Sequence, residues 1–172
     1  MATFGDTTQA ATYSFGYNDQ SLGTRFQLTE AGSVSKLSAY IDNLDTSHAL
    51  CHMRGVIYSD KAGPAPDALV GRSDEVTVAD SKAAGWVDLT FATPVSLAAG
   101  YYWLGLHLDG PAAGLRFYRD DTGGSSWYRN DTYSDGTLDP IGSVNSSTRV
   151  FSIYATYTTA TDRTPLIQFG IC

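Results

Sequence analysis

Apolar and polar residues alternate in short stretches along most of the chain, and turn-forming residues separate these stretches at roughly the 8–12-residue spacing typical of β-sandwiches and barrels. Alternation with a period of two places every second side chain on the same face of a β-strand. Helical periodicity is nearly absent. The pattern therefore predicts an all-β protein, a two-sheet antiparallel β-sandwich that is jelly-roll-like and carries a C-terminal extended arm.

The strongest alternation predicts a strand over residues 101–108. It turns Trp103 and His107 away from the core. The last strand, 150–157, is expected near the centre of a sheet, and Pro94 marks an edge segment because proline cannot donate to a β-ladder. The side chains predicted to face inward are Leu37, Ala39 and Ile41; Cys51, Met53 and Ile57; Val87, Leu89 and Phe91; Tyr102, Leu104, Leu106 and Leu108; and Phe151, Ile153, Ala155 and Tyr157.

The end of the chain differs from the body. We expect residues 1–157 to form the β-sandwich domain and residues 158–172 to form an arm, because a polar spacer precedes an apolar terminus. An apolar terminus left in water would promote aggregation, so it is expected to add to a sheet edge or to lie in a groove. The partner-binding residues of this arm are Leu166, Ile167, Phe169 and Ile171.

The length and the net charge of the chain exclude several classes of protein and partner. The chain has 172 residues, 42% of them hydrophobic, which suits one folded domain rather than a disordered chain. A net charge of −7 opposes a phosphate backbone, so nucleic acid is not an expected partner. No apolar run reaches the roughly 20 residues of a membrane span, and the polar N-terminus does not resemble a secretion signal.

Catalytic and metal-binding patterns are weak. Cys51 and His52 are adjacent, so on a strand they point to opposite faces and cannot act as nucleophile and base. No cofactor and no zinc site is expected. The aspartates of the Gly-, Ser- and Asp-rich excursion over 120–147 lack the ligand order of a calcium loop, although calcium binding there stays open. The protein is therefore expected not to be an enzyme; a hydrolase whose site is assembled from several loops is the weaker alternative.

Aromatic and polar residues supply the candidate binding site. Sugars bind where flat rings stack on apolar sugar faces while polar groups satisfy the hydroxyls. The long excursion could supply such groups beside the outward face of the strand over 101–108. Alternatively, the outward aromatics only cover a sheet beneath loops or pack against a neighbouring subunit. The candidate glycan-binding residues are Trp103, His107, Arg116, Tyr118, Trp127, Tyr128 and Arg129.

Several segments together resemble a jelly-roll β-sandwich module found in tailed-phage virion proteins and in modular extracellular bacterial proteins. The resemblance covers about residues 4–157, and its main segments are 23–42, 54–60, 76–78, 85–91, 94–97 and 100–107. It implies a non-catalytic virion structural protein, either a capsid decoration, a head fibre or a minor tail component, exposed on the particle surface. The expected partners are other virion proteins and copies of the same chain. The alternative is a carbohydrate-binding module or phage adhesin that binds host surface glycans.

Overall fold

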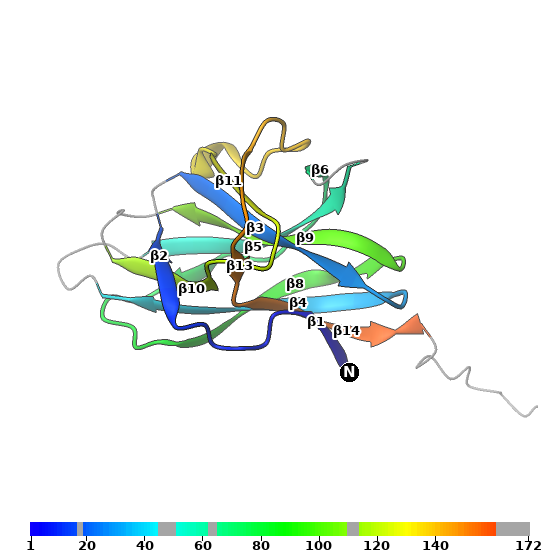
Figure 1. Cartoon of the computed structure of the whole chain (residues 1–172), viewed down its shortest axis with the longest axis horizontal. Helices are drawn as coiled ribbons and strands as arrows, with labels where there is room; N and C mark the ends of the chain where they lie inside the picture. Colours follow the sequence, from blue (N-terminus) through cyan, green and yellow to red (C-terminus); the bar gives the residue numbers. More distant parts are fainter. Residues whose placement is uncertain (17–18, 45–50, 62–64, 110–113, 161–172) are drawn as a thin grey trace, which may run out of the picture.

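The structure is a computed structural model that describes residues 1–16, 19–44, 51–61, 65–109 and 114–160. Within these ranges it contains fourteen β-strands and one short 3-10 helix, η1 (Tyr133–Asp135). The strands form two antiparallel sheets packed face to face (Figure 1). The predicted two-sheet antiparallel β-sandwich is confirmed. No helix in these ranges is long and apolar enough to cross a membrane.

Sheet A is organised around β4. One edge of β4 pairs with β8, and the other edge pairs first with β14 and then with β10. Beyond these strands, β1 pairs with β14, and β2 and β13 pair with β10. The strands of sheet A are β1 (Ala2–Gly5), β2 (Thr12–Phe15), β4 (Gly32–Asn43), β8 (Gly85–Leu97), β10 (Leu115–Asp120), β13 (Val150–Phe151) and β14 (Ile153–Thr159).

Sheet B has β3, β9 and β5 at its centre. Its order is β12-β11-β3-β9-β5-β6, with β7 also paired to β5. The strands of sheet B are β3 (Gln20–Leu28), β5 (Cys51–Asp60), β6 (Pro66–Arg72), β7 (Val76–Val78), β9 (Gly100–Asp109), β11 (Ser126–Asn130) and β12 (Asn145–Ser147).

The main core lies between the two sheets. Alternation along β4, β5, β8, β9 and β14 places the apolar residues of both sheets on facing surfaces, where their burial supplies the main driving force for folding. The residues predicted to face inward are part of this core, with Val87 and Tyr102 only partly buried at its margin. The predicted positions of two strands are confirmed as well: β14 lies between β1 and β4, and β8, with Pro94, pairs only with β4 within the described ranges.

A second apolar cluster covers the outer face of sheet B. Its members come from β5, β9 and β11 and from residues 131–144, the connection between β11 and β12 that we call the covering segment. Figure 1 shows this segment in yellow and orange above sheet B. One face of sheet B therefore packs on sheet A, and this cluster covers part of the other face, where Tyr101 stays 44% exposed. The buried residues of the second cluster are Val56, Tyr58, Trp103, Trp127 and Ile141.

The described chain ends shortly after β14. This strand continues to Thr159, and the Ala160 amide donates to the Ala31 carbonyl at 3.1 Å. The boundary predicted after residue 157 thus falls inside a strand of sheet A. The predicted arm residues Leu166, Ile167, Phe169 and Ile171 lie outside the described residues.

Candidate functional site

His107 belongs to a buried polar network beneath the covering segment. It is fully buried, and its Nε2 lies 3.1 Å from the carbonyl oxygen of Asp131, while Nδ1 lies 3.2 Å from the Thr137 hydroxyl. The Ser21 hydroxyl donates to the Asp131 carboxylate at 2.7 Å. Burial lowers the pKa of His107, although the negative charge of Asp131 acts in the opposite direction. Because Ser21, His107 and Asp131 are all buried, this group holds the segment in place and offers no ring face to a ligand.

The two tryptophans predicted for stacking are also buried. Trp103 and Trp127 are each 1% exposed. Trp103 Nε1 donates to Asp60 at 2.7 Å, and the same carboxylate accepts two bonds from Arg25. Neither indole presents a face to solvent, so neither can stack on a sugar in this structure. The alternative given above, that outward aromatics cover a sheet beneath a loop, describes both of them.

Arg116 and Tyr118 lie on the outer face of sheet A. Arg116 donates two hydrogen bonds to the buried carboxylate of Asp42, and the Tyr118 hydroxyl donates a third at 2.9 Å. The ion pair with Asp42 raises the pKa of Arg116. Arg129 donates to the Ile141 carbonyl and so fixes the covering segment. The seven candidate residues therefore do not form one site, and Tyr128, which is 41% exposed, is the one that lines a groove.

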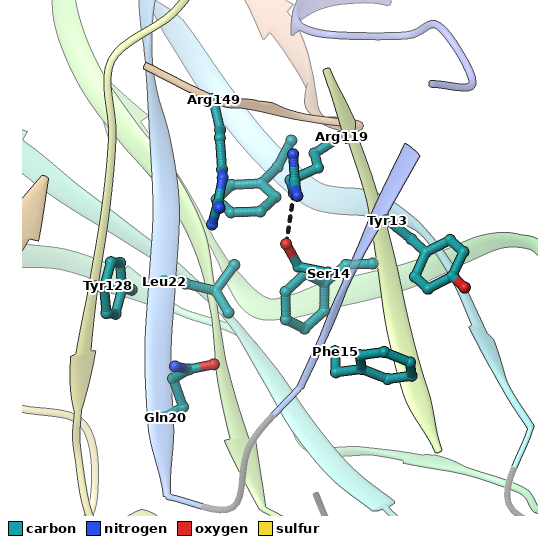
Figure 2. A pocket seen from close by; sticks show the side chains of 10 residues that line it. Tyr13, Ser14, Phe15, Gln20, Leu22, Arg119, Tyr128 and Arg149 are labelled. Carbon is teal, nitrogen blue, oxygen red and sulfur yellow. Dashed lines mark hydrogen bonds between the residues drawn. The ribbon is translucent and has the colours of Figure 1, made fainter. Parts of the chain in front are cut away.

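This groove is the open mouth of the sandwich, between β2, β10 and β13 on one side and β3 and β11 on the other (Figure 2). Its volume is about 510 Å³, within the range of small-molecule sites. Alternation explains its lining, because Gln20, Leu22 and Tyr128 share the inner face of sheet B while Ser14 and Arg119 share that of sheet A. The lining residues are Tyr13, Ser14, Phe15, Gln20, Leu22, Phe117, Arg119, Tyr128, Arg149 and Phe151.

Polar and aromatic groups occupy different parts of the groove. Figure 2 shows Arg119 and Arg149 together at one end and the Gln20 side chain toward the other. Tyr128 and Phe15, which are 41% and 45% exposed, lie on opposite sides of the mouth. Donors, an amide and exposed rings around an apolar floor are the groups that can bind a sugar ring and its hydroxyls.

Arg119 is fixed by its neighbours. Its Nε donates to the Ser14 hydroxyl, and its guanidinium forms an ion pair with Asp121. Burial lowers the pKa of Arg119, and the positive charge of Arg149 lowers it further. Arg149 itself forms no ion pair with any carboxylate of the described chain. Within the described chain, the groove therefore holds one guanidinium that a carboxylate compensates, Arg119, and one that no carboxylate pairs with, Arg149.

A row of aromatic rings crosses the outer face of sheet A. Tyr118 contacts Tyr40 at a centroid distance of 5.0 Å, Tyr40 contacts Trp86 at 5.3 Å, and Trp86 contacts Tyr154 at 4.9 Å. Tyr13 joins the Tyr118 end. Trp86 and Tyr13 are 36% and 39% exposed, so this aromatic row is partly open to solvent.

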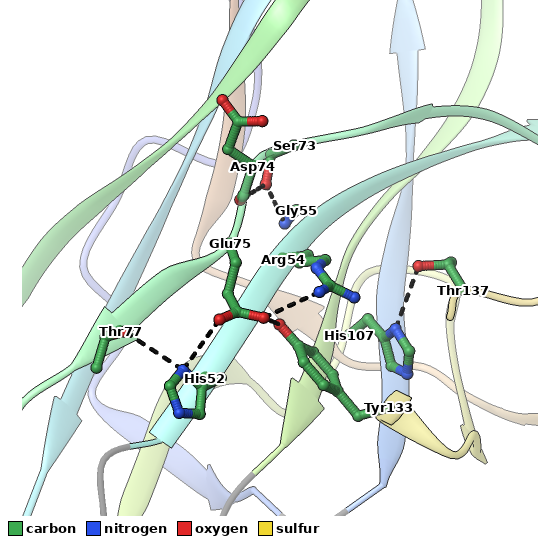
Figure 3. Close-up of polar contacts among 10 residues, drawn as sticks. All are labelled: His52, Arg54, Gly55, Ser73, Asp74, Glu75, Thr77, His107, Tyr133 and Thr137. Carbon is green, nitrogen blue, oxygen red and sulfur yellow. Dashed lines mark hydrogen bonds and ion pairs between the residues drawn. The ribbon is translucent and has the colours of Figure 1, made fainter. Parts of the chain in front are cut away.

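Two acidic residues near the covering segment make structural contacts. Glu75 accepts hydrogen bonds from Arg54 and Tyr133, both at 2.9 Å, and lies 3.2 Å from His52 Nδ1, which ties η1 to β5 (Figure 3). Asp139 accepts from the Leu69 amide at 2.9 Å. No group of three or more metal-ligating side chains occurs among the described residues.

The sequence interpretation missed the groove, because Ser14, Gln20, Arg119 and Arg149 carry no common motif and come from strands far apart in the chain. It also passed over the aromatic row, although strand alternation turns Tyr40, Trp86 and Tyr154 outward. Comparison with protein-family models and with curated proteins finds no match to this chain. The candidate site is therefore defined by its geometry.

Proposed function

We propose that the chain is a non-catalytic glycan-binding module whose binding site is the groove at the mouth of the sandwich. The observation that carries the proposal is the combination of exposed rings on both sides of the mouth with donors and an amide inside it. Together with the resemblance to phage virion modules, this favours a protein exposed on a phage particle that binds host surface glycans.

Two properties of the groove support a sugar over an apolar ligand. Arg119, Arg149, Gln20 and Ser14 provide at least one polar group on each wall. The apolar floor is part of the core, where Leu22 and Phe117 are 2% and 3% exposed. Such a lining favours the binding of a ligand that has both an apolar ring face and several hydroxyls.

A glycan array followed by isothermal titration of the bound glycans tests this proposal. We expect Tyr128→Ala and Gln20→Ala to weaken binding at least about tenfold, the equivalent of 1.4 kcal/mol. Tyr101→Ala is the matched control, because Tyr101 is 44% exposed and does not line the groove. No binding by the folded protein to any glycan, or equal losses in Tyr101→Ala and Tyr128→Ala, would contradict the proposal.

A second candidate is a structural role on the particle, as a capsid decoration, head fibre or minor tail component. The aromatic row on sheet A favours it, because tyrosine and tryptophan are enriched at protein interfaces. The occupant we propose for this face is another virion protein. The row lies on the outer face of sheet A whereas the groove opens between the sheets, and Tyr13 is the residue that belongs to both.

Co-sedimentation with phage particles tests the structural role. We expect Trp86→Ala to reduce the bound fraction while Tyr101→Ala leaves it unchanged, since both rings are exposed but only Trp86 belongs to the row. Deletion of residues 161–172 tests the predicted arm in the same assay. If the truncated chain and Trp86→Ala both attach as the intact chain does, neither surface connects the protein to the particle.

A further inference from the structure

The charge of the groove is opposite to that of the molecule. The chain carries 18 acidic and 11 basic residues, with a net charge of −7. Every charged side chain that lines the groove is nevertheless an arginine, and among the described residues no carboxylate lines it. A local positive site on an acidic protein attracts anions at short range, where the charges in the site outweigh the screened charge of the whole molecule.

The two arginines differ in how they are neutralised. Arg119 is buried and held by Asp121 and Ser14, so its guanidinium has a fixed position. Arg149 is half-buried and has no carboxylate partner in the described chain. Burial lowers the pKa of Arg119, and the positive charge of Arg149 lowers it further. Two like charges at one end of a groove repel each other, and an anion bound between them relieves this repulsion.

The rest of the groove provides for a larger ligand than a simple ion. Gln20 lies toward the end opposite the arginines, and the rings of Tyr128 and Phe15 flank the mouth (Figure 2). A guanidinium binds a carboxylate or sulfate through two parallel hydrogen bonds, which fixes orientation as well as charge. An acidic sugar at the arginine end would leave the adjoining sugar against the rings and the amide.

Resting on the proposed function, we infer that the glycan of this groove is acidic, and that Arg149 with Arg119 binds its carboxylate or sulfate group. The probes are a glucuronate-containing tetrasaccharide and the same tetrasaccharide with its carboxylates reduced to alcohols, which differ only in charge. An array of sulfated, sialylated and neutral glycans extends the comparison. We expect the acidic probe to bind at least tenfold more tightly than the reduced probe, and its affinity to fall as salt rises.

Variants of Arg149 test whether this residue causes the preference for acidic glycans. Arg149→Gln is expected to lose at least tenfold in affinity for acidic glycans and to lose clearly less for neutral ones, and Arg149→Lys is expected to recover part of the loss. Arg72→Gln removes the same charge from an exposed arginine outside the groove and is the matched control. Thermal unfolding checks that each variant is folded.

The outcomes separate the two proposals. Binding of neutral glycans alone, reduced by Tyr128→Ala but not by Arg149→Gln, would leave the glycan-binding function standing and overturn the acidic preference. Equal losses in Arg149→Gln and Arg72→Gln would also overturn it, because attraction to the overall charge would then explain the effect. Binding to no glycan of either class would overturn the proposed function itself.

Discussion

The rings of Tyr58 and Trp127 meet edge to face, with centroids 5.7 Å apart and planes at 90°. Tyr58 lies on β5 and Trp127 on β11, on the outer face of sheet B, and both are almost completely buried. The Tyr58 hydroxyl donates to the Leu138 carbonyl at 2.9 Å. This aromatic pair therefore connects the sheet to the covering segment. Its contribution to the free energy of unfolding can be measured.

Replacing Trp127 should be costly. We expect Trp127→Ala to lower the free energy of unfolding by about 3–5 kcal/mol, because it leaves a large cavity beneath the covering segment. Trp127→Phe should cost less than half as much, since it keeps a ring and removes an indole N–H that has no hydrogen-bond partner among the described residues. Urea denaturation measures both values. Tyr128→Ala, at the exposed neighbouring position, is the control, and a loss there equal to that of Trp127→Ala would contradict the expectation.

His107 should make stability depend on pH. Because burial lowers its pKa in the folded state, the unfolded chain binds a proton first as pH falls below about 6.5. Stability is therefore complete above that pH and is lost as pH decreases, by at most about 1.4 kcal/mol per pH unit for one proton. Burial is the main cause of the lowered pKa of His107; the charges of Asp131 and Asp19 oppose it and that of Arg54 adds to it.

Urea denaturation between pH 8 and about pH 5.5 tests this dependence. His107→Gln is expected to flatten the curve, because it removes the titrating group and keeps hydrogen-bonding capacity. The same replacement at the half-buried His52 is made in parallel, so that the change at His107 can be compared with the change at a second histidine. A steep loss of stability that persists in His107→Gln would assign the effect to other groups.

The Arg116–Asp42 pair should matter more than an exposed pair on the same face. Asp42 is 2% exposed, so Arg116→Ala would leave a buried carboxylate without its counter-charge, at a cost of about 3–5 kcal/mol. Lys36→Ala breaks the pair with the exposed Asp88 and should cost less than about 1 kcal/mol. Denaturant midpoints of the two variants provide the comparison, and similar losses in both would show that burial of Asp42 is not decisive.

Gly105 allows β3 and β9 to approach closely. It lies opposite Gly23, and a Cβ added at Gly105 would overlap the carbonyl group of Leu22. We expect Gly105→Ala to destabilise the fold by about 1–3 kcal/mol through overpacking. At Gly85 the nearest atom to an added Cβ is the flexible Lys82 amine at 3.6 Å, so Gly85→Ala should stay within about 0.5 kcal/mol. Thermal melting distinguishes the two, and a neutral Gly105→Ala would contradict the close approach.

The sandwich could be predicted because its core follows local alternation. Leu104, Leu106 and Leu108 face inward wherever β9 pairs, since a strand can turn only every second residue to one side. The same rule correctly predicted that Trp103 and His107 lie on the other face of the strand. It could not show that both would be buried, because that depends on residues 131–144 packing on sheet B, which is a contact between distant parts of the chain.

The groove could not be predicted for a related reason. Ser14 and Arg149 are 135 positions apart in sequence, and neither belongs to a recognisable motif. They meet only because β2 and β13 flank β10 on opposite edges. By contrast, the outward positions of Tyr40 and Trp86 follow directly from alternation, and their cross-strand pairing required only the register of β4 and β8.

The covering segment gives this domain a front and a back. A plain sandwich has two equivalent outer faces, and a partner could approach from either side. Here the chain's own covering segment occupies much of the outer face of sheet B, so within the described chain the outer face of sheet A is the more open one. The two outer faces of the domain therefore differ. If one end of the chain attaches the domain to a larger assembly, the groove and the aromatic row would be presented in one fixed orientation.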